Sequence, residues 1–293
     1  MVLNEIYFRK PASGRVVYYN PADVDVLVDQ KGAQVGAVLR EDGQPVESGG
    51  IGTMSKSRGN GVDPQALVER YGADTARLFT MFAAPPEQSL EWSDEGVEGA
   101  FRFMKRLWKA VHQHVGGGVA PALDVGALSG AERDMRRQVH ETLAKVTTDI
   151  GRRRVFNTAI AAVMELMNSL ARFEIRSPQG RAVAQEALEI VVLALSPVVP
   201  HACHSLWHDL GRPTAVVDER WPQVDPRALE RASIEVVVQV NGKLRGRVTV
   251  PSDADEGAVR EAALADANVQ RFMEGRPVRK FVYVPGKLAN VVV

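Results

Sequence analysis

Hydrophobic and polar positions change their period along this chain. Residues 1–48 alternate short apolar runs, such as 6–8 and 16–19, with turn residues, a pattern typical of short strands. Between 97 and 228, apolar residues recur at the three- and four-residue intervals of amphipathic helices. From 232 to 293 the alternation returns around one helical stretch. The pattern predicts a multidomain, mainly α fold: a small β-rich unit, a helical bundle and a compact α+β module.

Breaks and caps divide the predicted bundle into helices. A glycine run at 116–118 ends the first helix, and Ser129 and Glu132 have the spacing of a capping box at the start of the second. Later helices are predicted to start near Phe156, at Ser177 and near Pro200. The buried stripe predicted for the first helix consists of Val97, Phe101, Met104, Leu107, Trp108 and Val111.

In the last module, Asn241 and Gly242 form the strongest short hairpin signal of the chain. On the returning strand three cations alternate with apolar or small residues, so the pattern predicts that all three lie on one face. They are Lys243, Arg245 and Arg247. An ordinary solvated sheet face is the alternative to a phosphate-binding face.

Residues 49–96 carry a loop suited to phosphate. Lys56 provides a compact cation between the short hydroxyl donors Ser55 and Ser57. Gly59 and Gly61 allow the backbone to take a positive φ or to approach a ligand closely. The sequence therefore predicts a phosphate-binding loop here.

Two short helices are predicted to follow this loop. Asp63 has the position of an N-cap before Pro64, and Asp74 is predicted to begin and cap the second helix. A P-loop is the alternative interpretation, because Gly50 has the right offset from Lys56. Ser55 argues against it, since a P-loop has glycine there and a β-carbon would obstruct the backbone cradle.

The overall charge of the 293 residues is zero, so contact with nucleic acid would have to rely on local patches. The clearest patch, Arg152–Arg154, lies where two predicted helices meet. From there long cationic side chains can reach a phosphate backbone. A solvated helix face is the alternative.

Cys203 is the only cysteine, which excludes an intrachain disulfide and any zinc site made of several cysteines. It lies beside His201, His204 and His208, but no carboxylate or second cysteine has matching spacing, so we predict no metal site. No apolar run is long enough to span a bilayer, and the N-terminus lacks the order of a signal peptide. We expect no membrane partner and a cytoplasmic location.

Residues 53–57 resemble the Lys-Met-Ser-Lys-Ser signature of class I aminoacyl-tRNA synthetases in four of five positions, with Thr53 replacing the first lysine. Further segments follow in the order found in leucyl-tRNA synthetases. The chain therefore resembles the C-terminal portion of the bacterial enzymes of this family. These segments are Gly61–Pro64, Tyr71–Arg77, Leu90–Trp92, Phe156–Ile160, Pro200–Cys203, Val238–Lys243 and Val284–Leu288.

The resemblance implies four domains. Residues 1–48 would be an insertion specific to leucyl enzymes, and 49–96 the signature loop with a stem-contact region. Residues 97–228 would be a helical anticodon-binding domain, and 232–293 an α+β domain that binds tRNA.

The resemblance also implies a chemistry in which leucine and ATP, with Mg²⁺, give leucyl-adenylate, and the leucyl group then passes to tRNA-Leu. Lys56 would stabilise charge that develops on the phosphates. On this basis the catalytic residues are Lys56, Ser55 and Ser57. The ATP-binding loop is Thr53, Met54, Ser55, Lys56, Ser57 and Gly59, and tRNA binding falls to Arg152, Arg153, Arg154, Lys243, Arg245 and Arg247.

The His-x-Gly-His motif, with which the family's ATP fold begins, does not occur in this sequence. The leucine pocket and the editing domain are also missing, so we predict that the chain alone cannot form leucyl-adenylate. Two alternatives remain: a tRNA-binding module or subunit of a split enzyme, and, less favoured, a P-loop nucleotidase.

Overall fold

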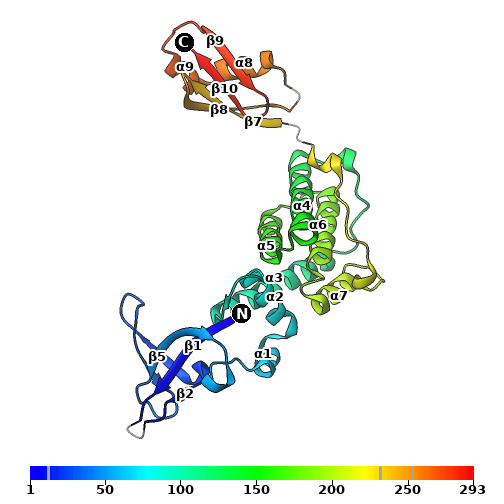
Figure 1. Ribbon diagram of the computed structural model, residues 1–293. Helices are drawn as coiled ribbons and strands as arrows, with labels where there is room; N and C mark the ends of the chain where they lie inside the picture. Colours follow the sequence, from blue (N-terminus) through cyan, green and yellow to red (C-terminus); the bar gives the residue numbers. More distant parts are fainter. Residues whose placement is uncertain (12–13, 231–232, 253) are drawn as a thin grey trace. The chain divides into compact units, whose positions relative to one another are not determined.

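The computed structural model describes residues 1–11, 14–230, 233–252 and 254–293 (Figure 1). The chain separates into two compact units, Met1–Ala228 and Leu229–Val293. It combines helices with several small sheets, which agrees with the predicted multidomain fold at this coarse level. Position 232, where the last module is predicted to begin, lies outside the described residues.

The N-terminal part of the first unit is β-rich. Its central strand β1 pairs in antiparallel fashion with β2 and β5 and in parallel with β6, while β3 and β4 form a separate hairpin. A small core around Tyr7 and Leu39 holds this part together. The strands are β1 (Val2–Arg9), β2 (Val17–Tyr19), β3 (Val24–Val28), β4 (Gln34–Leu39), β5 (Glu47–Thr53) and β6 (Leu90–Glu91).

Two helices, α1 (Pro64–Tyr71) and α2 (Ala73–Ala83), follow β5. Asp63 caps α1 as predicted, because its carboxylate accepts a hydrogen bond from the N–H of Gln65. The predicted role of Asp74 in α2 is wrong. Helix α2 begins one residue earlier, after Gly72, and no side chain caps its first turn.

Asp74 instead caps a different helix. Its carboxylate accepts hydrogen bonds from the backbone N–H of Ala202 at 2.7 Å and from Nδ1 of His201 at 2.9 Å, in the first turn of α7 (Pro200–Asp209). One turn further along α2, Arg77 donates hydrogen bonds to the carbonyl oxygens of residues 197 and 198. Both side chains therefore fix the start of α7 against α2.

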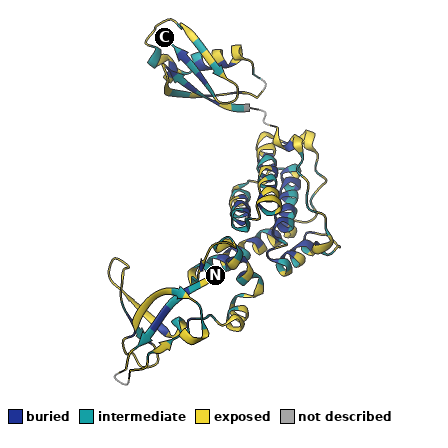
Figure 2. Cartoon of the chain, viewed as in Figure 1, coloured by how far each residue is buried: buried dark blue, intermediate teal, exposed yellow. Residues whose placement is uncertain are grey.

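The helical bundle follows, and its buried residues share one core with α2 and β6. Figure 2 shows that the buried positions lie along the facing sides of its helices. The capping box predicted from Ser129 and Glu132 is present at the start of α4. Besides α7 the bundle consists of α3 (Asp94–Gly116), α4 (Gly130–Thr148), α5 (Phe156–Arg172) and α6 (Pro178–Leu195).

One residue of the predicted buried stripe of α3 is misplaced. Leu107 and Val111 are fully buried, but Trp108 is 41% exposed. A step of one residue turns a side chain about 100° around a helix axis, so Trp108 falls outside the stripe that its neighbour occupies.

The second unit is a four-stranded sheet in the order β8-β7-β10-β9. Asn241 and Gly242 have φ values of 50° and 76°, so the predicted hairpin with two left-handed turn residues is confirmed. Val259 and Val269, from the two helices, are buried in the core of this unit. The elements are β7 (Ser233–Val240), β8 (Lys243–Pro251), α8 (Glu256–Ala265), α9 (Ala267–Met273), β9 (Lys280–Val284) and β10 (Leu288–Val292).

Candidate functional site

The loop predicted to bind phosphate leaves the end of β5. Met54 and Ser55 are extended out of the strand, and a short 3₁₀ turn, Lys56–Arg58, follows. Gly59 closes this turn with a φ of 62°, which requires the conformational freedom predicted for it. Gly61 does not adopt a positive φ, so its predicted role is limited to close approach of a ligand to the backbone.

A buried asparagine holds the loop in place. Asn60 is fully buried, and its Oδ1 accepts a hydrogen bond from the N–H of Ser55 at 2.9 Å. Its Nδ2 lies 3.4 Å from the carbonyl oxygens of Asn4, Gly52 and Thr53. Asn60 was not predicted to have a role in the site. Its only signal is a polar residue between two glycines, which does not reveal that the side chain points inward.

A second contact ties the loop to β1. Asn4 Nδ2 donates a hydrogen bond to the carbonyl oxygen of Asn60 at 3.1 Å, and Asn20 Nδ2 donates one to that of Gly61 at 3.0 Å. These contacts join three separate parts of the N-terminal region at the base of the loop. The backbone of the loop is therefore anchored while its tip faces outward.

The tip of the loop presents hydroxyl and ammonium groups. The Oγ atoms of Ser55 and Ser57 are 3.3 Å apart, and Lys56 is exposed. Within the described residues no carboxylate forms an ion pair with Lys56. An unpaired cation and two adjacent hydroxyls on a fixed backbone are suited to a phosphate ligand.

The arginines at 152–154 lie at an irregular end of α4. The helix continues into a π-helical turn, Asp149–Arg153, and Arg154 then takes a left-handed conformation with a φ of 57°. Arg152, Arg153 and Arg154 are all exposed. The turn therefore brings the three cations to the surface between α4 and α5.

Asp149 organises this turn. It is 1% exposed, and its carboxylate accepts hydrogen bonds from Lys145 at 2.5 Å, Arg153 at 2.7 Å and Thr158 at 2.7 Å. Burial alone would raise the pKa of Asp149, but these donors outweigh burial and hold the pKa below its usual range. Arg153 is therefore engaged internally. Within the described residues Arg152 and Arg154 form no ion pair.

The three cations of β8 do not share one face, so that prediction is wrong. In the strand register Lys243 lies opposite Val240 and Arg247 lies opposite Val237, two positions on opposite faces of β7. The reason is a β-bulge, because the register shifts between Val238 and Gln239 and leaves Arg245 without a partner in β7.

Beside the bulge, two arginines of β8 and one arginine of α9 line a common hollow. A hollow of about 630 Å³ is lined by Arg245, Arg247 and also Arg271 of α9. The guanidinium of Arg245 lies 3.8 Å from the ring centroid of Phe272, and Arg247 pairs with Glu235 at 3.1 Å. Arg271 was missed because nothing in the helical pattern of 267–273 indicates that it lies beside the bulge.

The histidines near Cys203 make other contacts. His201 contacts Asp74, His204 and His208 pack ring to ring, and Cys203 is fully buried, which raises the pKa of its thiol. In the part of the chain that the structure describes, no three histidine, cysteine or carboxylate residues are grouped to hold a metal ion. Nor does any described helix have the length and apolar character needed to cross a membrane.

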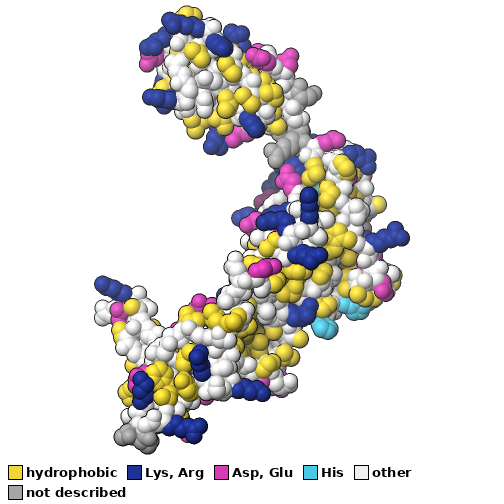
Figure 3. All heavy atoms as spheres, in the orientation of Figure 1, with side chains coloured by type: hydrophobic (Ala, Val, Ile, Leu, Met, Phe, Trp, Pro, Cys, Tyr) yellow, Lys and Arg dark blue, Asp and Glu magenta, His cyan; other side chains and the backbone are white. Residues whose placement is uncertain are grey.

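Basic residues are scattered over the surface. Figure 3 shows Lys and Arg side chains interspersed with hydrophobic and acidic ones on the visible face. This distribution fits the net charge of zero. Contact with nucleic acid on this face would therefore use several small basic groups.

Comparisons with known proteins agree with one another. Residues 132–260 match the family model "Anticodon-binding domain of tRNA ligase". The whole chain is 59% identical to the leucine–tRNA ligase of Chromohalobacter salexigens and 60% identical to that of Nitrosospira multiformis, and it spans 34% of the length of each.

A solved structure is also similar. It is the ternary complex of the agnB2 LeuRS of Agrobacterium radiobacter K84 with tRNA and LeuAMS, with 30% sequence identity and a TM-score of 0.70. The similarity covers 82% of this chain and 30% of that one. This chain therefore spans about a third of the length of the proteins that it matches.

Proposed function

Because the chain belongs to the leucine–tRNA ligase family and corresponds to the C-terminal third of its relatives, we propose that it is the tRNA-docking part of such a ligase and carries its signature loop. The observation that supports this most is the identity of 59% along the whole chain, which includes the loop at 53–57. In this proposal the protein acts in the cytoplasm, where tRNA is charged.

The loop would act on ATP. Lys56, exposed and unpaired within the described residues, would lie against the phosphates and stabilise the negative charge that increases as leucyl-adenylate forms. Ser55 and Ser57 would donate short hydrogen bonds beside it, with Thr53, Met54 and Gly59 shaping the loop. Mg²⁺ would enter with ATP, since the described residues contain no cluster of metal ligands.

The tRNA would contact basic groups in both units. We assign this role to Arg152 and Arg154, with Arg153 secondary because Asp149 already engages it. In the second unit, Arg245 and Arg247 would contact phosphates beside the bulge, and Lys243 would do so from the strand face opposite to that of Arg247. The similar LeuRS structure, which includes tRNA, supports tRNA as the partner.

The chain alone would not form leucyl-adenylate, because it spans about a third of the relatives' length and contains no His-x-Gly-His motif. A subunit of a split ligase, or a module that binds tRNA separately, is the second candidate. A P-loop nucleotidase fits poorly. Lys56 lies in a 3₁₀ turn after an antiparallel strand, and α1 starts only at Pro64, whereas a P-loop lysine directly precedes its helix.

Binding to tRNA-Leu and to a non-cognate tRNA across a salt series tests the proposal. We expect salt-dependent binding that prefers tRNA-Leu and weakens when Arg152 and Arg154, or Arg245 and Arg247, are changed to Gln. The matched control is the Arg15→Gln, Lys31→Gln double variant, which removes the same charge from exposed sites. Equal binding of both tRNAs, or none, would contradict the proposal, and so would leucine-dependent ATP–pyrophosphate exchange by the chain alone.

A further inference from the structure

Helix α3 has an exposed tryptophan whose setting is unusual for a surface residue. Trp108 is 41% exposed, and the ring of His112 packs against it with a centroid distance of 5.2 Å. The His112 ring in turn lies 3.6 Å from the carboxylate of Asp209 in α7. The indole is thus contacted by the His112 ring, and the exposed part of its surface is accessible to a planar ligand.

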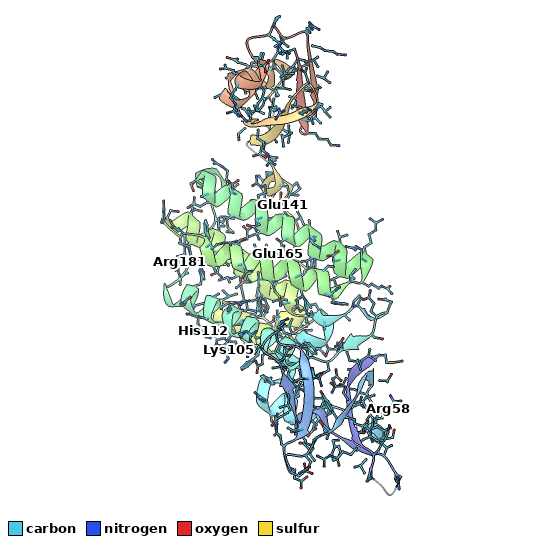
Figure 4. The ribbon with its side chains drawn as sticks, turned by 90° about the vertical axis from the view of Figure 1, so that its left-hand side faces the viewer. Arg58, Lys105, His112, Glu141, Glu165 and Arg181 are labelled. Carbon is cyan, nitrogen blue, oxygen red and sulfur yellow. The ribbon has the colours of Figure 1, made fainter. Side chains whose placement is uncertain are left out.

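Cations surround this tryptophan. Lys105, Arg106 and Lys109 project from the same helix and are exposed. Lys105 lies over the ring of Phe101 at 4.2 Å, and Arg106 lies 5.9 Å from that of Phe103. None of the three cations forms an ion pair with a carboxylate in the described ranges. This part of α3 therefore carries uncompensated positive charge. Figure 4 labels Lys105 and His112 on this helix.

Two hollows adjoin each other along α3. Lys105, Trp108 and His112 line the first, of about 410 Å³. The second, of about 420 Å³, has Arg106 at its edge and an apolar floor that includes Met167 of α5 and Leu188 of α6. Lys109 and Gln113 line both hollows, so a cation and an amide separate them.

We propose that this ridge of α3, comprising Lys105, Arg106, Trp108, Lys109 and Gln113, binds an unpaired segment of tRNA. One base stacks on Trp108, a neighbouring base enters the apolar hollow, and the three cations neutralise the intervening phosphates. This arrangement suits single-stranded nucleic acid, because stacking needs exposed base faces and the backbone needs adjacent cations. The inference rests on the proposed function and specifies a contact surface that is separate from Arg152–Arg154.

Stacking is tested with Trp108→Ala and Trp108→Phe in this chain. Trp108→Phe keeps an aromatic ring beside His112 and should retain the thermal stability of the wild type, and thermal denaturation of Trp108→Ala measures the loss of that packing separately from the loss of binding. We expect Trp108→Ala to weaken tRNA binding by about 5- to 100-fold, and Trp108→Phe to restore most of it, because an aromatic face remains. Addition of tRNA should quench the tryptophan fluorescence of the wild type more than that of Trp108→Phe.

Charge is tested with a Lys105→Gln, Lys109→Gln double variant. The slope of log K against log salt concentration is negative. We expect its magnitude to decrease by about 1.4 to 1.8, as for two lost phosphate contacts. The Arg15→Gln, Lys31→Gln variant, which loses the same charge away from α3, should keep the wild-type slope. If the chain binds tRNA and no α3 variant changes affinity, slope or quenching, the assignment to α3 is overturned while the proposed function stands. If the wild-type chain binds no tRNA, both are overturned.

Discussion

Asn60 and Ser55 close the candidate phosphate loop on itself, because the buried Oδ1 of Asn60 accepts the backbone N–H of Ser55 at 2.9 Å. The contact spans the turn that carries Lys56. A cation on a flexible stem gains precision at a phosphate only if the backbone below it is fixed. The buried side chain of Asn60 provides this support through the backbone of Ser55, one of the residues that would touch the ligand.

Replacement of Asn60 by Ala should therefore loosen the loop. The change leaves the Ser55 N–H without its acceptor in a poorly hydrated place, at a cost of about 1–3 kcal/mol in the free energy of unfolding. Urea denaturation measures this cost, and amide exchange at 55–59 should accelerate. Asn20→Ala is the comparison, because it removes hydrogen bonds to Gly61 and Ala22 but none to residues 55–59, and it should accelerate exchange at 55–59 less. Unchanged exchange at 55–59 would refute the anchoring role.

Lys56→Met should separate catalysis from stability. Because Lys56 is exposed, its loss should change the free energy of unfolding by less than about 0.5 kcal/mol. Under the proposed function, a complete ligase that carries this change should show leucine-dependent ATP–pyrophosphate exchange lowered by about 100-fold or more, because Lys56 would stabilise transition-state charge. Lys31→Met, an exposed lysine in a β-turn, is the matched control. An exchange rate near that of the wild type would exclude Lys56 from the chemistry.

Asp149 should make the bundle sensitive to acid. Its pKa in the folded chain is lowered, so it contributes stability above the pKa of an unfolded Asp, and this contribution is lost as the pH falls through the folded pKa. At pH 7, Asp149→Asn should reduce the free energy of unfolding by about 2 kcal/mol. The effect is smaller than for a fully buried ion pair, because Lys145 and Arg153 are half exposed and solvent screens their charges.

The difference between wild type and Asp149→Asn should shrink below the folded pKa of Asp149, where the wild-type carboxyl is also neutral. Denaturation at a series of pH values measures this. Asp134→Asn, an exposed carboxylate on the same helix that pairs with Arg137, should show almost no pH-dependent difference. A constant difference across the series would mean that the Asp149 charge does not stabilise the turn.

The helix caps and the hairpin turn could be predicted from the sequence because each is determined by interactions between residues close together in the chain. Asp63 and the pair Ser129 and Glu132 cap helices through backbone groups within three residues, and Asn241–Gly242 needs only its own left-handed conformations. Such features depend little on what packs against them.

The errors concern features set by distant contacts. Asp74 has the sequence position of a cap for α2, yet the amide that it binds belongs to Ala202, 128 residues away. The bulge at Arg245 is a property of the pairing with β7, so no alternation within 243–247 reveals it. In the candidate site, the lysine, serines and glycines of 55–61 were enough to predict the loop. The inward direction of the Asn60 side chain depends on its contact with Asn4 of β1, which the sequence does not reveal.

The contact between α2 and α7 gives a final prediction. Val199, the residue before α7, offers no side-chain cap, so Asp74 supplies the missing acceptor for the Ala202 N–H. Asp74→Ala should cost about 1–2 kcal/mol in the free energy of unfolding, and Asp74→Asn should cost less, because an amide oxygen still accepts. Exchange at the Ala202 amide should accelerate in the same order. Glu69→Ala, on the exposed side of α1, is the control and should have little effect. If Asp74→Ala leaves both stability and Ala202 exchange unchanged, the start of α7 is held by Arg77 and by packing alone.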